Sequence, residues 1–321
     1  MYCPEVSVLM PVYNAGRYLP EAVESILSQS FADFEFLIFD DGSTDGSYDI
    51  LHRYSLRDGR IRLFAKPHCG YVTWLNEGIQ IARGEYIARM DADDISLPQR
   101  LARQVEYMRQ KGECAVVGCD LVQIDSDGDL LNEVLHDTDH KAIEKDLLNG
   151  GLGVISHPAC IIRRSALLAV GGYRKEFETI EDFDLWFRLA EYGLLANLPE
   201  VLLKYRIHHS NVIFTHADQQ RHLADRILAE ARSRKGLEPL NHSIWNFSSP
   251  SRVGKHQWWA WLAAGAGNYK TAFKHARISI SEAPLSPQSW MTLCISVVPR
   301  NLRRGMKQVL SYAGLRANPI K

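Results

Sequence analysis

The stretch GEYIARMDADDISLPQRL, from Gly84 to Leu101, places a short apolar run directly before an acidic cluster and a helix. The run Tyr86 to Met90 predicts a buried strand, and Asp91-Ala92-Asp93-Asp94 ends it. Pro98 to Gln110 predicts a helix, since proline near its first turn is favourable there. An apolar strand that leads through a polar end into a helix is one unit of an α/β fold.

Similar units lie on both sides of this stretch. The other expected strands of the first 124 residues are Val6–Met10, Phe34–Phe39, Ile61–Ala65 and Ala115–Ile124. Helical spacing of apolar residues separates them at Arg17–Ser30, from Thr44 or Asp45 onward, and at Val72–Ala82. Short apolar strands between amphipathic helices predict an α/β fold with a central, mostly parallel sheet flanked by helices.

After residue 150 the pattern is less regular. It predicts strands over Val154–Ile162 and Val201–Ile207, and helices over Ser165–Val170 and Glu181–Tyr192. From Ala217 onward the pattern is almost entirely helical. Two of these helices, Trp258–Gly265 and Tyr269–Ser281, are expected to pair, either as one tetratricopeptide-type hairpin or as two packed helices of no repeat family. We therefore expect a catalytic domain over 1–215 and a helical, basic region over 216–321.

Polar residues gather where the expected strands end. Asn14 follows the first strand, Asp40 and Asp41 follow the second, and Asp91 and Asp93 follow the fourth. Ligands of open α/β sheets bind beyond the carboxyl ends of the strands. This coincidence predicts a binding site at that edge of the sheet.

The pair Asp91 and Asp93 has the residue types of a site for a hard cation. In extended chain, side chains two residues apart point the same way, so both carboxylates can face one ion. Magnesium or manganese is usually held by one or two carboxylates, with phosphate and water completing the shell. The alternative is a solvated acidic loop that caps the helix near Pro98.

Three further motifs each allow two interpretations. Asp40-Asp41-Gly42-Ser43-Thr44-Asp45 is a turn and helix cap, or it supplies a carboxylate that accepts a hydrogen bond from a base N–H. Pro11-Val12-Tyr13-Asn14 is a turn that ends a strand, or a backbone edge and a ring beside that base. Glu181-Asp182-Phe183-Asp184 provides acids that the helix dipole favours, or a general base.

The order and spacing of these elements narrow the choice. PVYN, DDGSTD, N-E-G-I, GEYIARMDADD, HPACIIRRSALLAVGGY and EDFDLWFRL follow one another between about residues 5 and 210. This series closely resembles the family-2 glycosyltransferases, whose nucleotide-sugar-binding fold is called GT-A. The resemblance implies an inverting enzyme that moves a sugar from a nucleotide-diphosphate sugar, with a UDP-sugar favoured, to an acceptor hydroxyl of a glycan or lipid-linked acceptor. Synthesis of a cell-surface polysaccharide or lipopolysaccharide is the expected setting.

The same resemblance implies roles for individual residues. Asp182 would be the catalytic base, Asp91 and Asp93 would hold Mn²⁺ or Mg²⁺, and His157, Arg163 and Glu181 would lie on the acceptor side. The nucleotide-sugar site would be formed by Pro11, Val12, Tyr13, Asn14, Asp41, Asn76, Asp91 and Ala92. Two residues depart from the family pattern: Trp74 stands where many relatives carry a small or polar residue, and Cys69 where Asn is common. Both concern the loop on the donor side.

Inversion agrees with the residues present. A nucleoside diphosphate leaves with developing negative charge, which a divalent cation can neutralise. The anomeric carbon passes through an oxocarbenium-like state, as in glycoside hydrolysis. One carboxylate on the opposite face, Asp182, can then take the proton of the attacking hydroxyl.

Charge is divided unevenly along the chain. The formal net charge is −1, which by itself argues against nucleic acid as a partner. Arg252 to Lys321 contains eleven basic residues, one acidic residue and four tryptophans, and so carries +10 against −11 for the rest. Basic residues with tryptophan are typical of a surface that lies on anionic lipid. Residues 252–321 therefore either contact the inner membrane face or form a solvated basic face over a tryptophan core.

Other features exclude several classes of protein. No run approaches the roughly 20 apolar residues of a membrane span, and the N-terminus lacks the pattern of a signal peptide, so we expect a cytoplasmic protein, peripheral on the membrane at most. The six cysteines and twelve histidines show no zinc spacing. Two alternatives to a glycosyltransferase are a nucleotidyltransferase, for which PVYNAGRYLPE is a poor phosphate loop, and a non-catalytic sugar-nucleotide-binding or scaffold protein.

Overall fold

In a computed structural model, the chain forms two compact units, and residues 3–238, 240, 245 and 250–297 are described. The first unit comprises residues 1–121, 135–205 and 226–239, and the second comprises residues 122–134, 206–225 and 240–321. The expected boundary between 215 and 216 remains a prediction. The basic cluster expected at Arg300, Arg303, Arg304 and Lys307 lies outside the described residues.

The strands belong to one sheet with the order β3-β2-β1-β4-β8-β6-β9-β5, and β7 pairs with β6. Their bounds are β1 Val6–Val12, β2 Phe34–Asp40, β3 Ile61–Ala65, β4 Tyr86–Arg89, β5 Ile95–Ser96, β6 Cys114–Ile124, β7 Leu130–Val134, β8 Ile161–Arg163 and β9 Leu194–Arg206. The pairs β1–β2, β1–β4 and β2–β3 are parallel. Beyond β4 the sheet continues with antiparallel pairs, β4–β8, β6–β8 and β5–β9.

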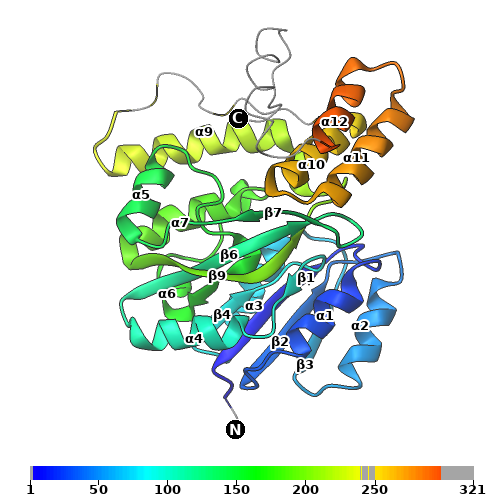
Figure 1. Cartoon of the computed structure of the whole chain (residues 1–321). Coiled ribbons are helices and arrows are strands. Elements are labelled where there is room, and N and C mark those ends of the chain that lie inside the picture. Colours follow the sequence, from blue (N-terminus) through cyan, green and yellow to red (C-terminus); the bar gives the residue numbers. More distant parts are fainter. Residues whose placement is uncertain (1–2, 239, 241–244, 246–249, 298–321) are drawn as a thin grey trace. The chain divides into compact units, whose positions relative to one another are not determined.

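Helices flank the sheet of the first unit (Figure 1). They are α1 Leu19–Leu27, α2 Ser47–Ser55, α3 Tyr71–Ile81, α4 Arg100–Gln110, α5 His140–Leu148, α6 Arg164–Ala169 and α7 Glu181–Tyr192, with short 3₁₀ turns η1 His157–Ala159 and η2 Lys175–Phe177. All seven residues of β1 and of β2 are buried, as expected for strands covered on both faces. In their register Val12 lies beside Asp40, so the two strands end together.

The described part of the second unit is mainly helical. Its helices are α8 Val212–Thr215, the first part of α9 Ala217–Arg234, α10 Arg252–Ala266, α11 Tyr269–Glu282 and α12 Pro287–Val297. The expected pairing of the helices around Gly267 and Asn268 is confirmed, because α10 and α11 pack together across that turn. Gly267 ends α10 with φ +89°, a left-handed conformation that glycine adopts readily. Trp259 is 1% exposed and belongs to the core of this unit.

One expected strand is wrong. Val154 to Ile162 was expected to be extended throughout, but only its end enters β8, and His157 to Ala159 form a 3₁₀ turn instead. Pro158 lies inside that turn, and Gly153 before it has φ +77°. The proline interrupts the apolar run, because it does not suit the interior of a strand, and the left-handed glycine lies directly before the run.

No helix within the described ranges is both long enough and apolar enough to cross a membrane.

Candidate active site

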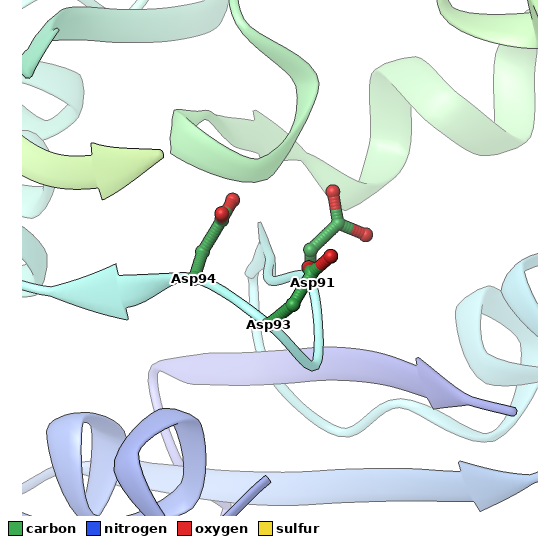
Figure 2. A group of neighbouring side chains, drawn as sticks. All are labelled: Asp91, Asp93 and Asp94. Atoms are coloured by element: carbon green, nitrogen blue, oxygen red, sulfur yellow. The ribbon is translucent and has the colours of Figure 1, made fainter. Parts of the chain in front are cut away.

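Three carboxylates gather on the turn between β4 and β5. Side-chain oxygens of Asp91, Asp93 and Asp94 all lie within 4.8 Å of one another, and Figure 2 shows the three side chains on this turn. Ala92 and Asp93 form a turn. A turn, and not the expected extended chain, therefore brings the carboxylates of Asp91 and Asp93 close together. The turn also adds Asp94, which is 1% exposed and which sequence reasoning did not assign to the site. A spacing rule for strands misses this third carboxylate, which the turn brings beside the other two.

A buried arginine fixes the start of this turn. Arg100, on α4, is fully buried and donates hydrogen bonds to the carbonyl oxygens of Arg89 (2.6 Å) and Cys160 (3.1 Å). Arg89 in turn forms an ion pair with Asp91. Burial lowers the pKa of Arg89, but Asp91, Tyr173 and Glu181 together outweigh burial and leave that pKa raised. The carboxyl end of β4 is therefore held by two guanidinium groups.

The donor set fits a hard divalent cation. Carboxylate oxygens are the ligands that Mg²⁺ and Mn²⁺ prefer. The negative charge of these carboxylates also acts on Tyr205, near the end of β9. Burial is the largest cause that raises the pKa of its phenol, followed by the charges of Asp94, Asp91, Asp93 and Asp182. A cation bound among the carboxylates would oppose that charge. Tyr205 was not expected at the site, since no pattern near it points there.

Asp182 lies in the first turn of α7 and is partly exposed. Burial, and then the negative charge of Glu181, raise its pKa to about 6. The backbone N–H of Phe183 donates to its Oδ1 at 2.8 Å, which favours the ionised form. Asp182 therefore has the protonation behaviour of a base that works near neutral pH.

Glu181 and His157 lie beside Asp182 and are buried. The Tyr71 hydroxyl donates to Glu181 Oε2 at 2.5 Å, and His157 Nδ1 lies 3.3 Å from Glu181 Oε1. His157 Nε2 is 2.8 Å from the hydroxyl of Tyr173. Burial, and then Arg89, lower the pKa of His157 to about 3, so the ring is neutral. Sequence reasoning named His157 and Glu181 but missed the two tyrosines that contact them.

On the donor side, Asp41 is almost completely enclosed. Its Oδ1 accepts from the Cys69 N–H and from the Trp74 indole, both at 2.7 Å. Its Oδ2 accepts from the Gly70 N–H at 3.1 Å and lies 2.8 Å from His68 Nδ1. With four partners and 2% exposure, Asp41 holds the loop at residues 68–70 in place.

The residues at the end of β1 divide into buried and exposed ones. Pro11 and Val12 are buried at the end of the strand. Tyr13 is 52% exposed, and its ring centroid lies 4.5 Å from that of His68. Asn14 has φ +50° and accepts the Thr44 N–H at 2.8 Å. An exposed ring pair therefore lies directly beside the loop that Asp41 holds.

Two of the expected site residues have other contacts. Both polar groups of the Asn76 side chain bind the backbone of Tyr173 at 2.8 Å, which ties α3 to the segment before α7. Arg163 pairs with Glu85 at 2.7 Å and lies beside Tyr86, at the opposite end of β4 from Asp91. Arg163 is therefore not brought together with Asp91, Asp93 and Asp94. Ala92 is 8% exposed and lies within the acidic turn.

Comparisons with known proteins agree on one family. The model of glycosyl transferase family 2 matches residues 7–171. An O-antigen biosynthesis glycosyltransferase, WbnJ of Escherichia coli, is 33% identical over 212 residues, which cover 64% of this chain and 81% of that protein. An uncharacterized glycosyltransferase, MJ1057 of Methanocaldococcus jannaschii, is 35% identical over 210 residues, 64% of this chain and 71% of that protein.

Two solved structures share the fold at low identity. TarS 1–349 of S. aureus in complex with UDP has a TM-score of 0.53 at 18% identity, covering 98% of this chain and 93% of that one. The mannosyltransferase PcManGT from Pyrobaculum calidifontis, in complex with GDP-Man and Mn²⁺, has a TM-score of 0.56 at 16% identity, covering 97% and 88%. At these identities the likeness concerns the fold alone.

Proposed function

The chain belongs to glycosyl transferase family 2, and from that premise we propose that it transfers a sugar from a nucleoside diphosphate to an acceptor hydroxyl with inversion. The observation that carries the proposal is that one structural unit contains both a cluster of three carboxylates and a separate, fourth carboxylate. Asp91, Asp93 and Asp94 suit a cation, and Asp182 suits a base. The field of both groups reaches the same phenol, that of Tyr205.

The base step follows from the protonation state of Asp182. With a pKa of about 6, its carboxylate is ionised at neutral pH and still basic enough to take a proton. As the acceptor oxygen attacks the anomeric carbon, its proton moves to Asp182 and the bond from that carbon to the diphosphate breaks on the opposite face. One displacement inverts the configuration, and no covalent sugar-enzyme intermediate is required.

Asp91 and Asp93 would hold Mn²⁺ or Mg²⁺ for the donor, with Asp94 beside them. When bound, the cation supplies charge neutralisation for the departing diphosphate. Three carboxylates this close make a strongly negative site, which a divalent cation would neutralise. Arg89 forms an ion pair with Asp91.

We assign a UDP-sugar as the favoured donor. The exposed Tyr13 ring, next to the buried ends Pro11 and Val12, supports a base-binding surface at the end of β1. Asp41 would serve it through the 68–70 loop, because its carboxylate accepts hydrogen bonds from the N–H groups of Cys69 and Gly70. TarS is described with UDP and PcManGT with GDP-Man, so both nucleotides belong in a test.

The proposed acceptor is a glycan or lipid-linked molecule, and the proposed position of the enzyme is on an anionic membrane surface. The exposed face of α11 supports this second part, since Tyr269, Lys270, Phe273 and Arg277 recur along it at helical spacing. Aromatic and basic side chains together are typical of a helix at a lipid interface. Trp259 does not contribute, because it is buried, whereas Trp290 is 51% exposed.

The proposed function is tested with Asp182→Asn. We expect release of UDP or GDP from UDP-N-acetylglucosamine, UDP-glucose and GDP-mannose, measured with Mn²⁺, to fall by a factor of about 10² to 10⁴ from that of the wild type on its preferred donor. Binding of UDP, measured by calorimetry, should stay nearly the same. Asp49→Asn, an exposed change on α2, is the matched control. Turnover by Asp182→Asn at the wild-type rate would remove Asp182 as the base.

A further inference from the structure

The hydroxyl of Tyr71 joins the start of α3 to the segment that begins α7. It donates to Glu181 Oε2 at 2.5 Å and accepts the backbone N–H of Thr179 at 2.8 Å. Thr179 has φ +88°, a left-handed conformation that a β-branched residue rarely adopts. One phenol therefore holds both a strained residue and the carboxylate that directly precedes Asp182 in the chain.

The hydrogen bond from Tyr71 favours the charged form of Glu181. Glu181 is 4% exposed, and a buried carboxylate stays ionised only where donors replace the lost water. The hydroxyl of Tyr71 is such a donor. His157, on the other side of Glu181, is a neutral ring in this environment and cannot compensate the charge as an imidazolium would.

We propose that Tyr71 is a positioning residue for the base, whose hydroxyl holds Glu181 in place beside Asp182. The inference rests on the proposed function, because it takes Asp182 as the base. Tyr71 is not a catalytic residue in this account, since it acts through Glu181 and needs no contact with either substrate.

The electrostatic consequence has a definite sign. Burial raises the pKa of Glu181, and the Tyr71 hydrogen bond opposes that rise. The charge of Glu181 in turn raises the pKa of Asp182, second only to burial. Without the hydroxyl, Glu181 would take up a proton at higher pH, its charge would be lost, and Asp182 would become a weaker base. The other titratable groups around this pair are unchanged by the substitution: Arg89, Asp91, His157, Tyr173 and Tyr205.

Tyr71 also stands at the end of the loop that Asp41 holds. The preceding residue, Gly70, donates its N–H to Asp41 Oδ2, and Lys175 Nζ reaches the carbonyl oxygen of Cys69 at 3.3 Å. The donor-side loop and the base-side segment are therefore tied at more than one point.

The test is Tyr71→Phe, which removes the hydroxyl and keeps the ring. In full-length protein with selectively ¹³C-labelled aspartate and without metal, the Asp182 carboxyl should titrate near pH 6 in the wild type. In Tyr71→Phe its midpoint should move to lower pH by about half a unit or more, which corresponds to a threefold change in proton affinity. Asp182→Asn assigns the resonance. The acid limb of donor turnover should move in the same direction.

A second variant shows whether Tyr71 acts through Glu181. Glu181→Gln alone should also lower the Asp182 midpoint, and adding Tyr71→Phe to it should change little more, since interacting residues give non-additive effects. Tyr192→Phe, an exposed change at the other end of α7, is the control and should titrate like the wild type.

The outcomes separate the two proposals. An Asp182 midpoint in Tyr71→Phe that equals or exceeds that of the wild type would overturn the inference about Tyr71, whatever the activity. If Asp182→Asn retains turnover while the midpoint moves as expected, the assignment of the base fails and the electrostatic link stands. Because the titration uses no substrate, the unknown acceptor does not affect it.

Discussion

The indole N–H of Trp74 donates a 2.7 Å hydrogen bond to Oδ1 of Asp41. Trp74 is fully buried on α3, and its ring stacks on Phe39 of β2 with centroids 5.3 Å apart. Trp74 is also one of the two residues expected to depart from the family pattern. Its indole takes one of the positions at which Asp41 can accept a hydrogen bond, and Asp41 also binds the backbone of Cys69 and Gly70.

Trp74→Phe should lower the free energy of unfolding by about 1.5–3 kcal/mol, because a hydrogen bond to a buried charged group is lost. Loss of ring volume adds to this cost. Thermal or urea unfolding measures the change. Trp290→Phe is the matched control, since the indole of Trp290 also donates to an oxygen, the carbonyl of Pro284, but is 51% exposed. Equal stability losses in the two variants would contradict the importance of the Asp41 contact.

Asp93→Ala should remove the part of UDP affinity that depends on metal. In the wild type we expect UDP to bind at least about tenfold more tightly with Mn²⁺ than with EDTA, a difference of about 1.4 kcal/mol. In the variant the two calorimetric affinities should coincide, since a ligand of the cation is gone. Asp49→Ala serves as the control on α2. A metal-dependent affinity that survives in Asp93→Ala would end the assignment of Asp93.

The second unit should lose stability as pH falls, because it buries a neutral histidine. Burial, and then His275, His209 and Arg252, lower the pKa of His256 to about 3, while Asp125 opposes them. The unfolded chain binds a proton near pH 6.5, so it binds more protons than the folded state between about pH 6.5 and 3. The stabilising contribution is complete above this window and is lost as the pH falls through it, by at most about 1.4 kcal/mol per pH unit.

His256→Gln should therefore flatten the pH dependence of unfolding between pH 7 and 5. The groups that face His256 are His275, with Nδ1 atoms 3.0 Å apart, the ring of His209, and beyond them Arg252 and Asp125. His222→Gln, an exposed change on α9, should leave the slope as it is. If the free energy of unfolding falls with pH equally in the wild type and in His256→Gln, another group causes the loss of stability in acid.

Binding to anionic vesicles tests the membrane proposal. Four basic residues near the C-terminus can be neutralised together: Arg300, Arg303, Arg304 and Lys307. Each contributes about 1 kcal/mol near such a surface, so flotation with phosphatidylglycerol vesicles at low salt should fall by two orders of magnitude or more. If the wild type fails to float under these conditions, the proposal is wrong.

A matched set distinguishes this effect from the loss of any four charges. Four exposed basic residues of the first unit can be changed to glutamine in the same way: Arg53, Arg57, Lys111 and Lys141. This control should float like the wild type. Equal losses in both sets would mean that total charge matters and that the C-terminal residues have no special part.

Local pattern predicted much of the first unit. The expected strand Phe34–Phe39 is found as β2, and the expected helix Glu181–Tyr192 as α7, because burial periodicity and helix length are properties of neighbouring residues. The helix expected from Pro98 begins at Arg100. The strand predicted from Val154 was wrong, because periodicity alone does not reveal where a turn that contains a proline interrupts an apolar run.

The sequence by itself determined the family, the α/β class and the positions of Asp91, Asp93 and Asp182, since these depend on residue type and spacing along one chain. Only the tertiary structure decided what surrounds them. Glu181 accepts a hydrogen bond from Tyr71, 110 positions away in the sequence, and Asp41 accepts one from Trp74, 33 positions away. The reason is physical: burial and neighbouring charges set the pKa of a carboxylate, and both arise from segments that packing brings together.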